Sequence, residues 1–265
     1  MIDIKQEIKK INNKGPILGT FEGSQNVGMT LEKALGKKPD RKSEPDFYGI
    51  EIKSKGKGNI YKYITLFNCG PIGKNQEIIR IKEKYGYFNK KNKTAYKIFN
   101  IAVYCNKLVQ IGGNRLATIK IDYQTNEIKL LILSPYLEIL DDKCRWSLEE
   151  LKKRLENKLN FLCYIKADKY VNNGEKYFSY DDVRLYKLKG FNEFLKLIEM
   201  GYIRINFKIN YYKSGTLQGK TYDHGTGFEI YESALDLLFT KIDWNLHMWN
   251  IWDQGNKKTI LFKYS

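Results

Sequence analysis

Residues 43–55 read SEPDFYGIEIKSK, and this stretch decides the interpretation of the chain. A Pro-Asp pair ending at Asp46 is followed by IEIK at residues 50–53. The alternation of apolar and charged residues in IEIK predicts a β-strand. Because side chains alternate between the two faces of a strand, Glu51 and Lys53 share one face and the two isoleucines share the other. We expect the isoleucines to enter the core and the two opposite charges to stand side by side.

Asp46 lies an odd number of residues before Glu51, so a straight strand would place the two carboxylates on opposite faces. Gly49, between them, can adopt the backbone conformations of tight turns and bulges. We therefore expect a turn or bulge at Gly49 that brings Asp46 alongside Glu51.

Two carboxylates and an ammonium group at one place suit phosphodiester hydrolysis. Asp46 and Glu51 would hold Mg²⁺, which neutralises charge on a phosphate and lowers the pKa of a bound water. Lys53 would position or help deprotonate that water and offset charge in the transition state. Glu32, on a predicted helix before the motif, is the candidate third metal ligand. Alternatively, these residues form a solvated strand face with a weak ion pair.

The charge of the chain favours a polyanionic partner. Lysine and arginine total 46 against 30 acidic residues, which gives a formal charge of +16. Nucleic acid is favoured over an anionic membrane because no basic amphipathic anchor helix is evident. Alternatively, part of the lysine content reflects nucleotide bias in the source.

The composition predicts a folded cytoplasmic protein. With 265 residues and 42% hydrophobic residues, the chain can bury a sizeable core. It shows neither a signal peptide nor an apolar run long enough to span a bilayer. The four cysteines, without a CxxC pair, predict reduced core residues and no zinc site; they are Cys69, Cys105, Cys144 and Cys163.

We predict one domain over residues 1–265, with a catalytic part at 1–140 and a DNA-recognition part at 141–265. Periodicity and capping signals predict the following helices and strands. The helices are 2–12, 30–35, 148–159 with Ser147 as its cap, 191–200 and a short one at 232–239. The strands are 50–53, 61–67, 96–104, 116–122, 127–133, 161–167 and 202–212, and residues 246–264 form an aromatic hairpin.

The motif resembles the PD-(D/E)xK signature of restriction-endonuclease-like nucleases. The order of VGMTLEKALG and EPDFYGIEIKSK is similar to the MutH branch of that fold. In that branch a helical glutamate precedes the aspartate and the ExK strand, and Glu32 matches this glutamate. Residues 211–230, YYKSGTLQGKTYDHGTGFEI, resemble the recognition loop of the MvaI/BcnI group of type II restriction endonucleases. The resemblance implies an α/β (α+β) core, with a mixed central sheet flanked by helices, and a β-rich DNA-recognition region.

The same resemblance implies a monomeric, Mg²⁺-dependent enzyme that cuts double-stranded DNA at short, GC-rich, CCNGG-like sites. It also implies a cognate DNA methyltransferase as genetic partner. The product is expected to carry a 5′ phosphate. Three alternatives are a MutH-like strand-nicking repair enzyme, a non-catalytic DNA-binding protein with a decayed nuclease fold, and a two-carboxylate glycosidase.

The loop has chemistry suited to reading bases. Acceptors and donors at base edges discriminate base pairs, and lysines that contact phosphates position the protein. The candidates for base contacts are Lys220, Tyr222, Asp223 and His224, and those for phosphates are Lys208 and Lys213. Alternatively, the DHG tripeptide forms a tight turn with a local side-chain bond. Tyr222 and Glu229 depart from the family pattern, which leaves the target sequence open.

Overall fold

The computed structural model describes residues 4–23, 25–37, 44–88 and 96–242, and the backbone of strands at 248–252 and 258–262. The chain forms two compact units. The first unit contains Met1–Tyr61, Asn157–Leu188 and Phe239–Ser265; the second contains Lys62–Glu156 and Lys189–Leu238. The chain leaves the first unit after Tyr61, builds most of the second, and returns to the first unit twice.

The first unit holds a five-stranded sheet in the order β1-β12-β11-β2, with β16 also paired to β12. Its elements are α1 (Ile4–Asn12), β1 (Ile17–Leu18), α2 (Asn26–Ala34), β2 (Ile50–Gly56), β11 (Phe161–Asn172), β12 (Glu175–Leu188) and β16 (Phe239–Ile242). β2 and β11 are parallel and the other pairs are antiparallel, so the sheet is mixed, as expected. Parallel neighbours need a long crossover, and here the chain of 62–156 lies within it.

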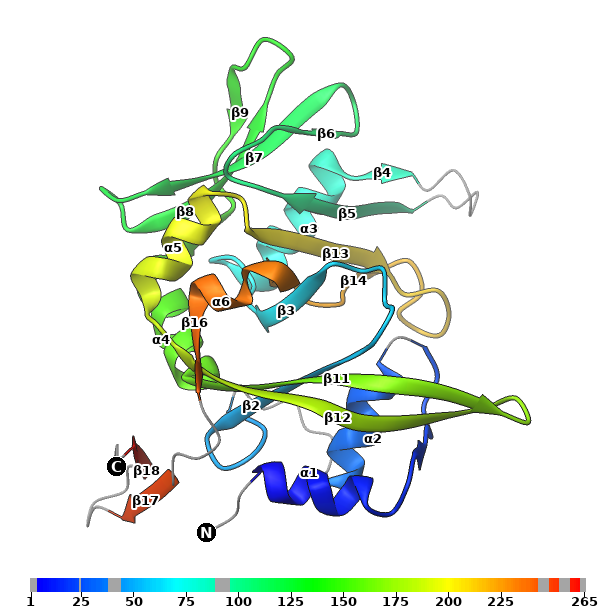
Figure 1. Ribbon diagram of the computed structural model, residues 1–265. Coiled ribbons are helices and arrows are strands. Elements are labelled where there is room, and N and C mark those ends of the chain that lie inside the picture. The colour runs from blue at the N-terminus through cyan, green and yellow to red at the C-terminus, as the bar shows by residue number, and fades with distance from the viewer. Residues whose placement is uncertain are drawn as a thin grey trace. The chain divides into compact units, whose positions relative to one another are not determined.

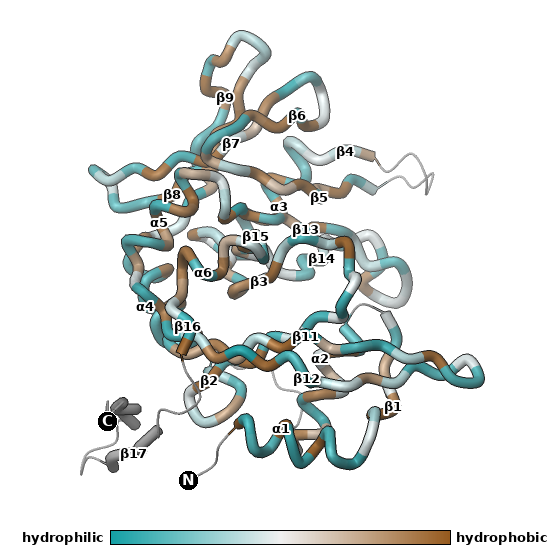
Figure 2. Tube along the Cα trace, viewed as in Figure 1, coloured by the Kyte–Doolittle hydropathy of each residue, from teal (hydrophilic) through white to brown (hydrophobic). Residues whose placement is uncertain are grey.

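α1 and α2 cover one face of this sheet (Figure 1). The isoleucines of α1 recur at helical spacing and are buried, so the otherwise hydrophilic helix presents one apolar stripe (Figure 2). They join a core with Ile50 and Ile52 of β2 and with Cys163 and Ile165 of β11. The predicted inward direction of the two β2 isoleucines is confirmed. Glu51 and Lys53 consequently face away from this core.

The second unit is rich in antiparallel strands. One sheet has the order β3-β15-β13-β5-β4 with β14 paired to β13, and another has β10-β8-β7-β6 with β9 paired to β8. The strands are β3 (Tyr63–Asn68), β4 (Tyr87–Phe88), β5 (Lys97–Val103), β6 (Val109–Ile111), β7 (Arg115–Asp122), β8 (Glu127–Leu133), β9 (Ile139–Asp141), β10 (Arg145–Ser147), β13 (Ile203–Tyr211), β14 (Thr221–Asp223) and β15 (Gly227–Tyr231). The helices are α3 (Lys74–Tyr85), α4 (Leu148–Leu159, which ends in the first unit), α5 (Phe191–Glu199), the 3-10 helix η1 (Glu232–Ala234) and α6 (Leu235–Leu238).

The predicted elements are present, most of them with shifted ends. The expected helix at 30–35 begins earlier, at Asn26, whose buried side chain accepts a hydrogen bond from Thr30 Oγ1 at 2.9 Å. Ser147 caps α4 as predicted, since its Oγ accepts the Glu150 amide at 3.4 Å. The terminal hairpin is confirmed in its strands β17 (Met248–Trp252) and β18 (Lys258–Phe262). Its side chains and residues 253–257 lie outside the described residues.

The cysteines are free thiols, in agreement with the sequence. Cys69, Cys144 and Cys163 are buried and Cys105 is half-buried. Burial raises the pKa of each thiol, to about 11 for Cys69 and about 12 for Cys163. In the described part of the chain, no helix has the length and apolar character needed to cross a membrane.

Candidate active site

A tight turn folds Asp46 back against the strand that carries Glu51. Tyr48 and Gly49 both have positive φ, at 46° and 86°, as in the primed turns of two-residue hairpins. Phe47 and Ile50 close the turn through two main-chain hydrogen bonds of 2.9 Å. Oδ2 of Asp46 then accepts the amide of Ile52 at 3.0 Å. The expected turn at Gly49 is confirmed.

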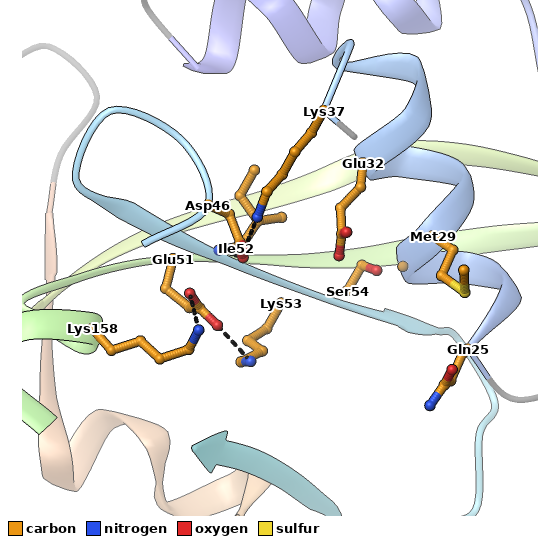
Figure 3. Close-up of a pocket in the computed structure, with 11 residues that line it drawn as sticks. Gln25, Met29, Glu32, Lys37, Asp46, Glu51, Ile52, Lys53, Ser54 and Lys158 are labelled. Atoms are coloured by element: carbon orange, nitrogen blue, oxygen red, sulfur yellow. Dashed lines mark hydrogen bonds and ion pairs between the residues drawn. The ribbon is translucent and has the colours of Figure 1, made fainter. Parts of the chain in front are cut away.

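This turn, β2 and α2 enclose a cavity of about 430 Å³ in the first unit (Figure 3). Both carboxylates of the motif line it, together with Lys53 and with Glu32 from α2. All four residues expected to act in catalysis therefore meet in one cavity. The other lining residues are Gln25, Gly28, Met29, Lys37, Ile52, Ser54 and Lys158.

Glu51 is buried and has an ammonium group near each carboxylate oxygen. Lys53 Nζ lies 2.6 Å from Oε1, and Lys158 Nζ lies 3.2 Å from Oε2. The Lys158 contact is an ion pair without hydrogen-bond geometry, so Oε2 is a buried oxygen that lacks a hydrogen-bond partner. Burial raises the pKa of Glu51, and the charge of Asp46 adds to this, against the opposing effect of the lysines.

Asp46 and Glu32 have opposite electrostatic environments. Burial acts to raise the pKa of Asp46, but hydrogen bonds from Lys37 and the Ile52 amide outweigh it and lower that pKa. The pKa of Glu32 is raised, first by burial and then by the neighbouring Asp46 charge. Asp46 is thus an ionised anchor, whereas Glu32 carries its charge at an energetic cost.

Lys37 and Lys158 are cavity residues that the sequence analysis did not identify. Lys37 follows the Gly36 that ends α2 and pairs with Asp46. Lys158 lies in the last turn of α4, just before β11. Because β11 runs parallel to β2 with Leu162 opposite Glu51, the end of α4 is brought to this carboxylate. No local sequence pattern signals that contact.

The carboxylates of the cavity have the donor chemistry that Mg²⁺ prefers, because it binds oxygen ligands. Among the described residues no three His, Cys, Asp or Glu side chains are grouped closely enough to hold a metal ion. Lysines are paired with Asp46 and Glu51 instead. The buried Oε2 of Glu51, without a hydrogen-bond partner, is an oxygen that a cation would satisfy. The donor chemistry of these carboxylates, rather than their present spacing, therefore fits a divalent cation.

The other candidate residues lie in the second unit, around β13 and β14. Tyr222 and His224 are exposed, and their rings meet edge to face at 4.4 Å; Lys213 and Lys220 are also exposed. Oδ1 of Asp223 accepts the Gly225 amide at 2.9 Å, so the local side-chain turn considered above is present. Burial raises the pKa of Asp223.

Lys208 contacts Glu229, one of the two residues that depart from the family pattern. Its Nζ lies 2.9 Å from Oε1 of Glu229, which is fully buried. Glu229 also accepts two hydrogen bonds from Arg204, at 2.8 and 3.0 Å, and one from Asn206 at 3.0 Å. The polar face of β13 is therefore organised around a buried carboxylate rather than simply solvated.

Comparison with known proteins shows the family of the chain. The model of the MvaI/BcnI restriction endonuclease family matches residues 5–239. The chain belongs to the MvaI/BcnI restriction endonuclease family. It is accordingly a type II restriction endonuclease, a site-specific deoxyribonuclease, and the expected α/β fold is confirmed.

Two solved structures are similar to this family member over nearly its whole length. One is the restriction endonuclease MvaI in complex with its cognate DNA substrate, with a TM-score of 0.81 and 26% identity over 90% of this chain and 96% of that one. The other is MvaI in the absence of DNA, with a TM-score of 0.58 and 25% identity over 90% and 95% of the two chains. A search of curated protein sequences gave no match.

Proposed function

We propose that this restriction endonuclease hydrolyses double-stranded DNA in a Mg²⁺-dependent reaction at the cavity formed by Asp46, Glu51, Lys53 and Glu32. The observation that carries the proposal is that these four side chains line one cavity although they come from a helix, a turn and a strand. Asp46, Glu51 and Glu32 would hold the cation. When bound, Mg²⁺ supplies positive charge beside the scissile phosphate.

The protein's own groups have distinct roles in this reaction. Lys53 is held by Glu51 at 2.6 Å and directs its ammonium group into the cavity, where it offsets negative charge as water attacks phosphorus. The 3′ oxygen leaves, so the product has a 5′ phosphate and a 3′ hydroxyl. The Ile52 amide fixes the Asp46 carboxylate, which restricts the orientation of this ligand.

Recognition of DNA is assigned to the second unit. The similar MvaI structure, which is a complex with cognate DNA, and the charge of +16 on the whole chain support DNA binding in general, and the candidate recognition residues lie in this unit. Lys220, Tyr222, Asp223 and His224 are proposed to read a short GC-rich site. Lys208 and Lys213 are proposed to contact phosphates. A CCNGG-like site is the first to test, and the departures at Tyr222 and Glu229 leave the exact target sequence open.

A plasmid cleavage assay tests the nuclease. Incubation with Mg²⁺ is expected to give discrete ends with 5′ phosphates, and EDTA is expected to abolish cleavage. Lys53→Ala is expected to lower the rate at least about 100-fold. Lys55→Ala is the matched control, since Lys55 lies on the same strand and face outside the cavity lining. Equal cleavage by wild type and Lys53→Ala, or equal inactivity on plasmids of known methylation, would refute the proposal.

The same assay separates the restriction enzyme from a nicking repair enzyme. Linear products with matching ends on both strands support restriction, whereas single-strand nicks that require a second protein support the MutH-like alternative. A monomer in the cytoplasm, with a cognate methyltransferase encoded nearby, completes the proposal. Sedimentation of the protein and protection of DNA by that methyltransferase test these parts.

A further inference from the structure

Lys158 enters the cavity from a part of the chain outside the catalytic motif. Its side chain is only 18% exposed, and it approaches Glu51 from the opposite side to Lys53 (Figure 3). The parallel register that places Leu162 opposite Glu51 holds the end of α4 in position. Lys158 is therefore a half-buried cation in the cavity whose role the motif chemistry does not explain.

The two lysines contact Glu51 in different ways. Lys53 Nζ lies 2.6 Å from Oε1, whereas Lys158 Nζ lies 3.2 Å from Oε2 and makes no hydrogen bond to it. Charge-assisted hydrogen bonds are stronger and more directional than simple proximity of charges. Lys158 is therefore the more readily exchanged of the two partners of Glu51.

The charges that line the cavity are balanced. The carboxylates are Glu32, Asp46 and Glu51, and the ammonium groups are Lys37, Lys53 and Lys158. A balanced cavity has no surplus positive charge for a DNA phosphate. Cancelling the charge of one carboxylate leaves one ammonium group available within the same cavity.

We propose that Lys158 is a DNA phosphate-binding residue that Glu51 holds paired until the charge of Glu51 is neutralised. This proposal rests on the nuclease function proposed above. With Glu51 charged and no cation present, Lys158 is paired and adds little to DNA binding. With that charge cancelled, Lys158 pairs with a backbone phosphate that enters the cavity.

A double-mutant cycle in EDTA tests the proposal without any cleavage. The binding of a fluorescein-labelled 24-base-pair duplex containing a CCNGG site is measured by anisotropy over a series of salt concentrations. Glu51→Gln mimics the neutralised carboxylate. In the wild-type background, Lys158→Gln is expected to change affinity less than about twofold. In the Glu51→Gln background, it is expected to weaken binding about tenfold and to lower the salt slope by about 0.9.

Two further variants keep the result interpretable. Lys153→Gln removes an exposed charge from the same helix, outside the cavity lining, and its effect is expected to be the same in both backgrounds. Lys158→Arg keeps the charge and is expected to keep the salt slope, and thermal unfolding shows whether each variant is folded.

An equal effect of Lys158→Gln in the two backgrounds overturns the proposal. So does a loss of the salt slope in Lys158→Arg while that variant is folded. Failure of the nuclease function itself would look different, because wild-type protein would then leave plasmid DNA uncut in Mg²⁺.

Discussion

The main-chain amide of Ile52 donates a 3.0 Å hydrogen bond to Oδ2 of Asp46, so β2 itself fixes the carboxylate that precedes it. The contact requires the chain to reverse at Tyr48 and Gly49, both with positive φ. Burial would raise the pKa of Asp46, but Lys37 and this amide lower it. The turn therefore affects both the position and the charge of a carboxylate that we propose as a metal ligand.

Gly49→Ala is expected to cost about 1–2 kcal/mol of folding free energy, because φ is 86° in the left-handed region. It should also lower the cleavage rate at least about tenfold, since a change in the turn displaces Asp46. Thermal unfolding and plasmid cleavage measure the two effects. Gly15→Ala is the matched control: Gly15 also has φ of 86°, and a Cβ there meets nothing within 4 Å. Equal activity of the two variants would contradict this role of the turn.

Glu32→Gln is expected to stabilise the protein at neutral pH while reducing cleavage. The folded-state pKa of Glu32 is raised by burial and by the Asp46 charge. Protonated Glu32 therefore stabilises the folded protein. This contribution to the free energy of unfolding is fully present below the unfolded-state pKa of Glu32 and is lost as the pH rises through its folded-state pKa. Melting temperatures of wild type and Glu32→Gln should differ at pH 7–8 and converge below about pH 4. A difference that persists unchanged at low pH would show that ionisation of Glu32 is not its cause.

Glu229→Ala is expected to destabilise the protein by about 3–5 kcal/mol, because it leaves the nearly buried Arg204 without its carboxylate. Urea unfolding followed by circular dichroism measures the loss. Thr65→Val removes a weaker contact to the same carboxylate, at 3.4 Å, and should cost less than about 1.5 kcal/mol. Comparable losses in the two variants would mean that the charge network is not what stabilises this sheet.

Asp223→Asn is expected to alter recognition without disrupting the local turn. Its amide oxygen can still accept from Gly225, as Oδ1 does now, while an amino group replaces the second acceptor. Cleavage at the preferred site should fall by a factor that corresponds to about 1–3 kcal/mol. Sequencing of the DNA ends measures the change in site preference. Asp236→Asn, at an exposed position on α6, is the control and should cut as wild type. Unchanged rate and sites for Asp223→Asn would exclude Asp223 from base reading.

Strands with a clear alternation of apolar residues were predicted from the sequence, whereas elements that depend on pairing or packing with distant segments were not. β8 occurs at the expected 127–133. Its alternating apolar residues identify the buried face of the strand from the sequence alone. In contrast, α3 and β12 were not predicted. The apolar residues of α3 are separated by many charges, and β12 is defined mainly by eleven paired positions with β11 across the turn at Asn173 and Gly174. Because these pairings depend on β11 as well as on β12, the sequence of β12 alone does not predict this strand.

The sequence by itself determined the turn at Gly49 and the shared face of Glu51 and Lys53, because chain reversal and strand alternation depend on neighbouring residues. Only the tertiary structure decided that Lys158 completes the environment of Glu51. The contact arises from the parallel pairing of β2 and β11, and the intervening chain builds most of another compact unit. Strand alternation places side chains within one strand, but the charge around a buried carboxylate depends on every segment that packs against it.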